Sequence, residues 1–322
     1  MKLFIHLLIL FSLLNANYLK IFDNFRQGKN WEINVDKFLY SDLYINFLLK
    51  NKDVKFGYFD NPTNIIVCYK NKKNLDVYSY DNSFKLINKF SNILTGKNDG
   101  DKWQEGDGKT PIGVYTLKYK IDDEKLNDFY GPLAYPTNYP NLYDSYLGKS
   151  GHGIWIHGFP KDNPNRSFNT KGCIALPNNE LLKLSKMIDY KNSILIISTK
   201  NLPTTNKKKI SIILKEIFRW RFAWKYNDLD TYLSFYDKKH FKKENRYGFS
   251  YFSFMKKQIF ARQKSKILKF ENLQIIPYPS VDDNIYKVSF YEHFKSGNKT
   301  FNGDKVLYIK LINNKIKIFL EN

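Results

Sequence analysis

Short runs of hydrophobic and β-branched residues, separated by turn residues, dominate the middle of the chain. Their length and composition predict strands at 63–70, 75–80, 84–90, 152–158 and 192–198. Residues 178–188 (NNELLKLSKMI) instead repeat their hydrophobic residues at helical spacing, with Asn178 or Asn179 as the expected N-cap. We therefore expect a mostly-β domain with one or two helices over residues 58–200.

A helical pattern precedes this β-rich region. Within residues 31–52, hydrophobic side chains fall near helical spacing at Leu39, Leu43, Phe47 and Leu48. A short helical segment, assigned to 17–57, has to bury this stripe against the next domain or against a second copy of the chain. The pattern leaves a homodimer through residues 17–57 as one of these two alternatives.

The last third of the chain changes pattern again. Residues 200–209 are polar, contain a proline and end in a lysine run, which is typical of a linker. Two helical stretches follow, and then three strand-like runs at 271–278, 286–296 and 304–322. Helices followed by strands, without alternation, predict an α+β domain over residues 206–322. The whole length of 322 residues also suits two domains better than one.

The first residues resemble a secretory signal. Lys2 precedes an apolar run at 3–14, and the small residue Ala16 follows it. A membrane-spanning helix needs about 20 apolar residues, so the run is short for a span. We expect residues 1–16 to be a signal peptide, the protein to be periplasmic, and no stable membrane insertion after cleavage. An uncleaved anchor or a buried strand is the alternative.

The charge is strongly positive and unevenly distributed. The formal net charge is +21, and residues 206–322 contain 25 Lys and Arg against 11 Asp and Glu. A basic face concentrates anionic polymers. For an exported protein this indicates an acidic envelope polymer as partner and no nucleic acid. A compositional bias towards Lys and Asn explains the charge equally well.

Two cysteines, Cys68 and Cys173, allow three interpretations. An oxidising compartment favours a disulfide between them. Cys68, however, lies in a strand-like apolar run and is expected to be a buried core thiol.

A metal site at Cys173 is the second interpretation, and it would need the nearby histidines. His152 and His157 are five residues apart in a strand-like run, so their side chains point to opposite faces and do not share a metal ion. We expect no metal and no cofactor, and a nucleophilic Cys173 is the third interpretation.

A nucleophilic thiol needs a base or a positive field nearby, because its unperturbed pKa is about 8.5. His157 supplies that base if the loop 158–172 folds back. Backbone N–H groups around Gly172 and Cys173 are suitably placed for an oxyanion hole. Lys171 is either a holder of a substrate carboxylate or a solvated side chain.

Three separated motifs resemble the L,D-transpeptidase (YkuD-type) catalytic domain. They are DGKTPIGVYTL at 107–117, with its Thr-Pro-x-Gly, IWIHG at 154–158, and TKGCIAL at 170–176, with its Ser/Thr-x-Gly-Cys. The resemblance covers about residues 60–198. It implies that Cys173 attacks the carbonyl of an L-centred residue, usually diaminopimelate, which is linked to a terminal D-amino acid. It further implies that His157 is general base and then acid, that the Gly158 carbonyl orients the imidazole, and that D-alanine leaves from a thioester intermediate.

Other residues around these motifs are candidate substrate contacts. Thr170 belongs to the cysteine motif, Trp155 shares a strand face with His157 and either lines the cleft or packs in the core, and Arg166 either binds a substrate carboxylate or lies on the surface. The family often has His where Lys171 stands and Arg or Asn where Ala175 stands. These departures count against cross-linking.

The segment 131–158 resembles a proteobacterial subgroup with an added C-terminal domain, whose members trim tetrapeptides to tripeptides and set helical cell shape. The resemblance implies an L,D-carboxypeptidase acting on peptidoglycan stem peptides and muropeptides. A transpeptidase that forms cross-links or exchanges D-amino acids, and a non-catalytic envelope-binding scaffold, are the alternatives.

Residues 218–237 (FRWRFAWKYNDLDTYLSFYD) and the strand-like runs that follow resemble the NTF2-like (SnoaL-type) fold. Such folds enclose a cone-shaped pocket, which implies binding of a glycan or peptide. His240 and His293 are expected to be structural.

Overall fold

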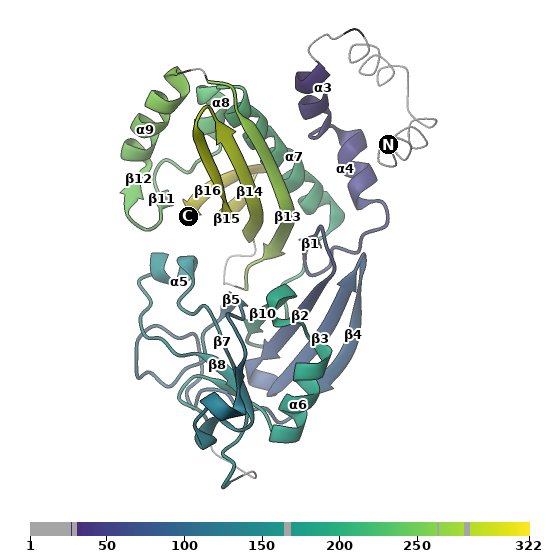
Figure 1. Cartoon of the computed structure of the whole chain (residues 1–322), viewed down its shortest axis with the longest axis vertical. Coiled ribbons are helices and arrows are strands. Elements are labelled where there is room, and N and C mark those ends of the chain that lie inside the picture. The colour runs from purple at the N-terminus through teal and green to yellow at the C-terminus, as the bar shows by residue number, and fades with distance from the viewer. Residues whose placement is uncertain (1–26, 28–30, 164–168, 263, 280–283) are drawn as a thin grey trace.

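The computed structural model describes residue 27 and residues 31–163, 169–262, 264–279 and 284–322. Figure 1 shows two bodies, one above the other, with short sheets in the lower body and long curved strands in the upper one. The expected signal peptide at 1–16 lies outside the described residues. Within the described part of the chain, none of the helices is both long and apolar enough to span a bilayer.

A five-stranded sheet forms the centre of the lower body. Its strand order is β4-β3-β2-β10-β5. The strands are β2 (Thr63–Tyr69), β3 (Asn74–Asp81), β4 (Ser83–Phe90), β5 (Gly113–Thr116) and β10 (Ser193–Ser198). β2 and β10 pair in parallel, although they lie far apart in the chain. The predicted strands at 63–70, 75–80, 84–90 and 192–198 are therefore confirmed.

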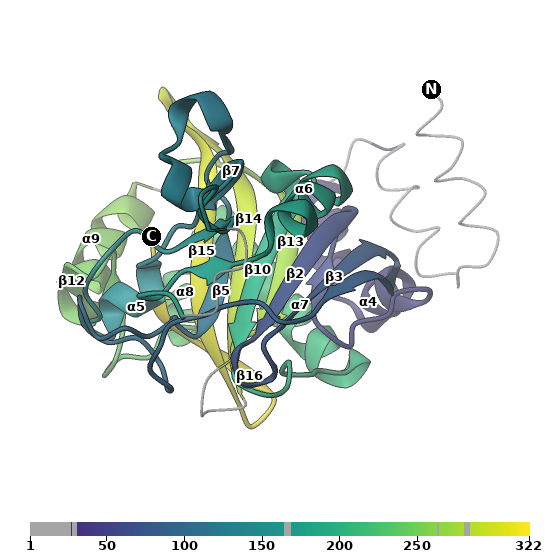
Figure 2. The same cartoon turned by 90° about the horizontal axis from the view of Figure 1, so that it is seen from below.

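A four-stranded sheet, ordered β6-β7-β8-β9, completes the lower body. Its strands are β6 (Ile121–Asp122), β7 (Leu133–Pro136), β8 (Trp155–His157) and β9 (Ile174–Ala175). The predicted strand at 152–158 is shorter than expected, because β8 begins only at Trp155. Helix α6 (Asn178–Met187) packs Leu181 and Leu184 against the five-stranded sheet and covers one of its faces (Figures 1 and 2). Four 3-10 helices and one short α-helix also lie in the described part of this body: η1 (Lys70–Lys72), η2 (Asp123–Lys125), η3 (Asp128–Tyr130), η4 (Tyr190–Asn192) and α5 (Leu142–Tyr146).

In the upper body, three helices from the last third of the chain pack on a long, mostly antiparallel sheet. The helices are α7 (Lys207–Lys225), α8 (Leu229–Ser234) and α9 (Phe249–Ala261), and the long strands are β13 (Ile267–Pro277), β14 (Ile285–Ser296), β15 (Lys299–Ile312) and β16 (Lys315–Glu321). The sheet also contains β1 (Tyr58–Phe59), β11 (Lys242–Lys243) and β12 (Tyr247–Gly248), in the order β1-β13-β14-β15-β16-β11-β12. The α+β prediction is confirmed, and Trp220 lies at the centre of the core between helices and sheet.

Two details of this body differ from the sequence prediction. The run at 304–322 is not one strand but parts of two, because Asn313 and Asn314 take positive φ values of 50° and 59° and turn the chain back between β15 and β16. Asparagine tolerates this left-handed conformation, which a two-residue hairpin turn requires. The lysine run at the end of the expected linker is helical, since Asn206 caps α7 by accepting a hydrogen bond from the Lys209 N–H at 3.0 Å.

In the part of the N-terminal segment that the structure describes, the helical pattern of residues 31–52 forms two helices, α3 (Trp31–Phe38) and α4 (Asp42–Leu49), rather than one. Ser41 starts the second helix by accepting a hydrogen bond from the Tyr44 N–H. The break changes which side chains are buried: Ile45 and Leu49 enter the core beside α7, while Leu43 and Phe47, which the sequence placed in the stripe, are exposed. The side chains that α4 buries within the chain are therefore Ile45 and Leu49, and none of the four residues of the predicted stripe is fully buried.

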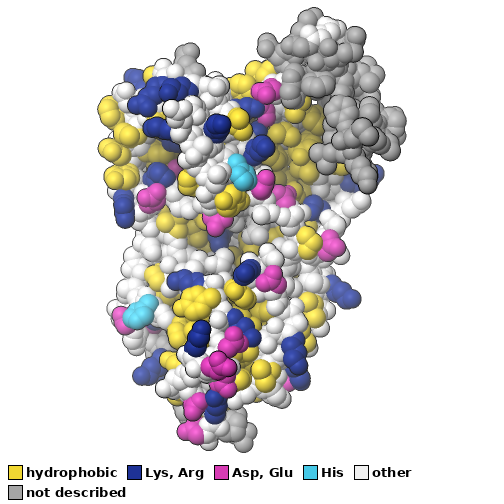
Figure 3. Space-filling view, in the orientation of Figure 1, with side chains coloured by type: hydrophobic (Ala, Val, Ile, Leu, Met, Phe, Trp, Pro, Cys, Tyr) yellow, Lys and Arg dark blue, Asp and Glu magenta, His cyan; other side chains and the backbone are white. Residues whose placement is uncertain are grey.

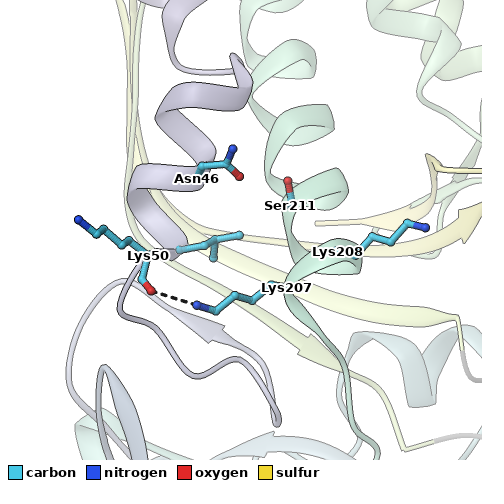
Figure 4. Close-up of a pocket in the computed structure, with 6 residues that line it drawn as sticks. Asn46, Lys50, Lys207, Lys208 and Ser211 are labelled. Atoms are coloured by element: carbon cyan, nitrogen blue, oxygen red, sulfur yellow. Dashed lines mark hydrogen bonds between the residues drawn. The ribbon is translucent and has the colours of Figure 1, made fainter. Parts of the chain in front are cut away.

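Polar contacts reinforce this docking. Asp36 on α3 accepts hydrogen bonds from Arg221 at 2.7 Å and from the Tyr226 hydroxyl at 2.8 Å. Further along, α4 and α7 meet around a hollow of about 280 Å³, where Lys207 donates to the backbone carbonyl of Lys50 at 3.1 Å (Figure 4). The N-terminal helices are therefore an integral part of the upper body.

A shared core joins the two bodies. Val114 and Ile196 of the five-stranded sheet pack with Tyr308 and Phe319 of the long sheet, all of them buried. Asn141 donates to the Val114 carbonyl at 3.2 Å and to the Tyr278 hydroxyl at 3.1 Å, which bridges the two bodies. Because the junction is hydrophobic and hydrogen-bonded, the bodies form one packed unit.

Candidate active site

The loop before β9 is shaped by Thr170. Its hydroxyl oxygen accepts a hydrogen bond from the Gly172 N–H at 3.1 Å and donates to the Cys173 carbonyl at 2.7 Å. Gly172 has a φ of 144°, and a Cβ there would lie 2.8 Å from the Lys109 carbonyl oxygen. Both the backbone conformation and the close approach require glycine, so the Thr-Lys-Gly-Cys sequence builds a tight loop that presents Cys173.

Only one of the two thiols is accessible. Cys173 is half-buried, and its thiol donates to the Gly153 carbonyl at an Sγ–O distance of 3.3 Å. Cys68 is fully buried on β2, where burial raises the pKa of its thiol to about 12. The two cysteines are not bonded to each other, so the disulfide alternative is not present in this structure.

His157 lies at the end of β8, almost fully buried. Its Nδ1 is 2.6 Å from the Gly158 carbonyl oxygen. A carbonyl oxygen only accepts, so Nδ1 has to hold the proton, and in the neutral ring Nε2 is the basic nitrogen. Parallel pairing of β8 with β9 places His157 opposite Ala175, two residues after Cys173. This pairing places the histidine motif on β8 next to the cysteine motif that leads into β9.

Asn178 packs against the two residues that follow His157, which is not the role expected from its place in the sequence. Its side-chain oxygen accepts from the Phe159 N–H at 2.8 Å, and helix α6 is capped at Pro177 without a side-chain hydrogen bond. A Cβ on Gly158 would lie only 2.2 Å from this same oxygen. Asn178 therefore determines how closely residues 158–159 approach the helix, and the expected N-cap role is wrong.

Tyr130 is a second site residue that the sequence did not single out. Its ring meets the His157 ring edge-on, with 5.1 Å between centroids, and packs against Trp155 at 4.9 Å. Its carbonyl accepts from the Gly158 N–H at 2.8 Å. Trp155, half-buried, therefore belongs to the same aromatic group as the histidine, as its strand position predicted. No sequence signal marked Tyr130, because η3 lies well upstream of β8 and only the tertiary fold joins them.

The Thr-Pro-x-Gly segment packs against the cysteine loop. Thr110 accepts a hydrogen bond from the Gly96 N–H at 2.8 Å, and the buried Lys70 ammonium binds the carbonyls of Gly100 and Thr110.

Asp107 holds the start of the same segment. It accepts from Lys102 at 2.8 Å and from the backbone N–H groups of Trp103, Gln104 and Lys109. Burial acts to raise the pKa of Asp107, but these donors outweigh it and lower the pKa to about 2. The segment is thus rigidly held where its Lys109 carbonyl meets Gly172.

Comparison with known proteins identifies this arrangement. The L,D-transpeptidase catalytic domain (YkuD) family matches residues 63–197, and the Cds6 C-terminal NTF2-like domain family matches residues 212–322. The crystal structure of the helical cell shape determining protein Pgp2 from Campylobacter jejuni is 39% identical, covers 88% of this chain and 100% of its own, and superimposes with a TM-score of 0.79. The chain belongs to the YkuD family.

Other comparisons agree on the fold. The crystal structure of a point mutant of the same Campylobacter jejuni Pgp2 is 38% identical, with a TM-score of 0.80 over 88% of this chain and 98% of that one. Bdellovibrio bacteriovorus Bd1075 is 23% identical, with a TM-score of 0.64 over 84% and 96%, which shows the shared fold. No curated protein sequence matches the chain significantly. The fold class is therefore confirmed: a mostly-β YkuD domain, an NTF2-like domain and a short helical N-terminal segment.

Lys171 and Arg166 are the remaining predicted substrate contacts of this YkuD domain, and His152 is the histidine that the sequence assigned to the scaffold. Lys171 is exposed, beside the buried Gly172. Arg166 lies outside the described residues. His152 is exposed and precedes β8, so strand alternation does not explain its separation from His157; its Nδ1 is 3.8 Å from a Glu105 carboxylate oxygen. In the described ranges there is no group of three or more His, Cys, Asp and Glu residues that could hold a metal ion.

Proposed function

We propose that the protein is a peptidoglycan L,D-carboxypeptidase that removes the terminal D-alanine from tetrapeptide stems and thereby influences cell shape. The observation that supports this most directly is an accessible Cys173 thiol two residues before Ala175, the strand partner of His157, whose Nδ1 is held by the Gly158 carbonyl. The chain also shares its two-domain arrangement with Pgp2, which is described as a helical cell shape determining protein.

In the proposed reaction, His157 Nε2 takes the proton of Cys173 while the sulfur bonds to the carbonyl carbon of the L-centred residue. The C–N bond then breaks, His157 returns the proton to the departing D-alanine amine, and a thioester remains. Water attacks the thioester with His157 again as base, and the C–S bond breaks to release the tripeptide. Gly158 holds the imidazole in one tautomer through both half-reactions.

The loop geometry refines the roles of the neighbouring residues. The Gly172 N–H already donates to Thr170, so Gly172 contributes mainly to the loop's shape. The exposed Lys171 can approach the terminal carboxylate of a stem peptide, to which an ammonium group is attracted. Trp155 and Tyr130 place two packed aromatic rings next to His157.

Hydrolysis is favoured over cross-linking by the residues around Cys173. The family often has a histidine at the position of Lys171 and Arg or Asn at the position of Ala175. Ala175 is completely buried in β9 and offers no polar group to an incoming acceptor amine. A transpeptidase, which would resolve the same thioester with an amine, is the second candidate, and a non-catalytic envelope-binding scaffold is the third.

The test is incubation of the purified protein with tetrapeptide muropeptides, followed by mass spectrometry. We expect tripeptides and free D-alanine, abolished by Cys173→Ala and retained by the buried control Cys68→Ala. Cross-linked dimers or exchanged D-amino acids would instead assign transpeptidation. Intact tetrapeptide after incubation with folded protein would overturn both enzymatic assignments.

Export completes the proposal. Residues 1–16 direct the protein to the periplasm, where stem peptides and muropeptides are its partners, and nucleic acid is not. Sequencing the N-terminus of protein recovered from the periplasmic fraction tests this, and a cytoplasmic protein that retains Met1 would contradict it.

A homodimer through residues 17–57 is the remaining proposal. It would use the exposed Leu43 and Phe47, and sedimentation that is independent of concentration would exclude it.

A further inference from the structure

Helix α9 exposes most of its hydrophobic residues. Tyr251, Phe254, Met255 and Ile259 are 51%, 58%, 41% and 38% exposed, and Tyr247 just before the helix is 43% exposed with its ring stacked on Tyr251 at 4.7 Å. These five residues, here called the α9 stripe, recur mostly at spacings of three and four and so line one side of the helix. A contiguous apolar strip of this kind marks an interaction surface on a folded protein.

The stretch of chain that contains the stripe is basic. Residues 245–270 contain no Asp or Glu but have seven cations: Arg246, Lys256, Lys257, Arg262, Lys264, Lys266 and Lys269. Of these, all but Lys256 and Lys266 are exposed. Lys238, from the segment after α8, adds a further ammonium 6.0 Å from the Phe249 ring at the start of α9. Figure 3 shows hydrophobic and basic side chains together along the upper edge of the molecule where α9 lies.

The opposite side of α9 already anchors the helix to the protein. Phe252 and Phe260 are buried in the NTF2-like core. Lys256 turns inward, with its ammonium 4.4 Å from the Trp224 ring centroid and 5.1 Å from that of Tyr232. The stripe is therefore not needed to hold α9 in place, and its exposure requires another explanation.

We propose that α9 docks on the surface of a bilayer that contains anionic phospholipids. The α9 stripe enters the boundary between headgroups and acyl chains, and the surrounding Lys and Arg side chains bind lipid phosphates. Helices that lie in the membrane interface combine an apolar face carrying aromatic residues with a cationic rim. From Tyr251 to Ile259 the stripe extends about 12 Å along the helix axis, which suits a helix lying in the interface and is too short for a span.

Two other occupants fit these observations less well. In a symmetric dimer through α9, the basic rim of one copy would face that of the other, and the like charges would repel. An anionic polymer in water would pair with the cations but would leave the apolar stripe exposed. Only an anionic lipid surface satisfies both the charge and the apolar side chains.

The test is co-sedimentation with vesicles of phosphatidylglycerol and phosphatidylethanolamine, using the chain from Asn17 onward so that the apolar run at 3–14 does not bind lipid itself. We expect binding that high salt weakens. The triple variant Phe254→Ser, Met255→Ser, Ile259→Ser should weaken it by about tenfold or more. The double variant Lys257→Gln, Arg262→Gln should weaken binding and reduce its salt dependence.

A matched control is Phe301→Ser with Ile312→Ser on β15, which are 47% and 48% exposed but lie outside the stripe. This control should bind like the parent chain, and all variants should melt at similar temperatures. Equal binding by the α9 triple variant, or equal binding of the parent to pure phosphatidylcholine vesicles, would overturn the proposal. So would lipid-free self-association that the triple variant removes, because the stripe would then be an interface between copies.

Discussion

The Gly158 carbonyl oxygen lies 2.6 Å from Nδ1 of the preceding His157, so a backbone group orients the imidazole. The position of that carbonyl depends in turn on Asn178, whose side-chain oxygen binds the next residue, Phe159. In many catalytic triads a third side chain fulfils this role. Here the orientation of the base depends on how closely two backbone segments pack.

Gly158→Ala should therefore inactivate the enzyme without unfolding it. The new Cβ would lie 2.2 Å from the Asn178 side-chain oxygen and 2.9 Å from Pro132, so the backbone has to move and the imidazole with it. A displacement of about 1 Å at a catalytic group costs roughly 100-fold in rate. The measurement is the rate of D-alanine release, with Gly248→Ala as control, since a Cβ at Gly248 meets nothing within 4 Å. Wild-type rates in Gly158→Ala would show that the carbonyl does not orient the base.

Thr170→Val should damage the cysteine loop more than Thr170→Ser. Valine removes the hydroxyl that binds the Gly172 N–H and the Cys173 carbonyl and leaves both groups without that partner, at a cost of about 1–3 kcal/mol in unfolding free energy. Serine keeps both hydrogen bonds. We expect denaturant unfolding to show this difference and the rate of the serine variant to remain near that of the parent. If valine and serine behave alike, the hydroxyl does not shape the loop.

Thiol labelling should distinguish the two cysteines in the native protein. Iodoacetamide at neutral pH should modify the half-buried Cys173 and spare Cys68, whose pKa burial raises to about 12. Mass spectrometry of the labelled protein should show one adduct, absent in Cys173→Ala and present in Cys68→Ala. An unreactive Cys173, or one bonded to Cys68, would favour the non-catalytic scaffold.

Lys287→Met should stabilise the protein at neutral pH. Lys287 lies two residues after Ile285 on β14, so the two side chains point to the same face, towards the core between the two bodies. Burial there lowers the pKa of the Lys287 ammonium to about 8. Below pH 8 the native protein has to hold this charge, at a cost of about 3 kcal/mol by linkage from an unfolded pKa of 10.5. Methionine has a similar length and no charge, so a gain of about 1–3 kcal/mol is expected.

The pH dependence provides the control for this last prediction. Between pH 8 and 10.5 the unfolded chain binds a proton at Lys287 that the native protein does not, so the stability of the parent rises with pH over this range. The advantage of the methionine variant should therefore shrink as the pH rises from 8 to 10.5. An advantage that does not change with pH, measured by urea unfolding, would mean that the effect comes from packing alone.

Local patterns predicted most of the secondary structure because each depends on neighbouring residues. The β-rich runs became β2, β3, β4 and β10, and the helical run at 178–188 became α6. The errors arose at turns, because a single turn changes the direction of the chain and therefore which of the following side chains are buried. Ser41 restarts the N-terminal helix and moves Leu43 and Phe47 to the surface, and two asparagines divide the last run into β15 and β16.

The sequence alone determined the motifs of this protein and their order: Thr-Pro-x-Gly, then a histidine followed by glycine, then Thr-Lys-Gly-Cys, which together mark the family. Only the tertiary structure decided which residues surround them. Tyr130 meets the His157 ring and Asn178 binds Phe159, each from another segment of the chain, and α9 turns Lys256 inward while it leaves Phe254 exposed. Burial and close approach arise from contacts between residues far apart in the chain, which no local pattern contains.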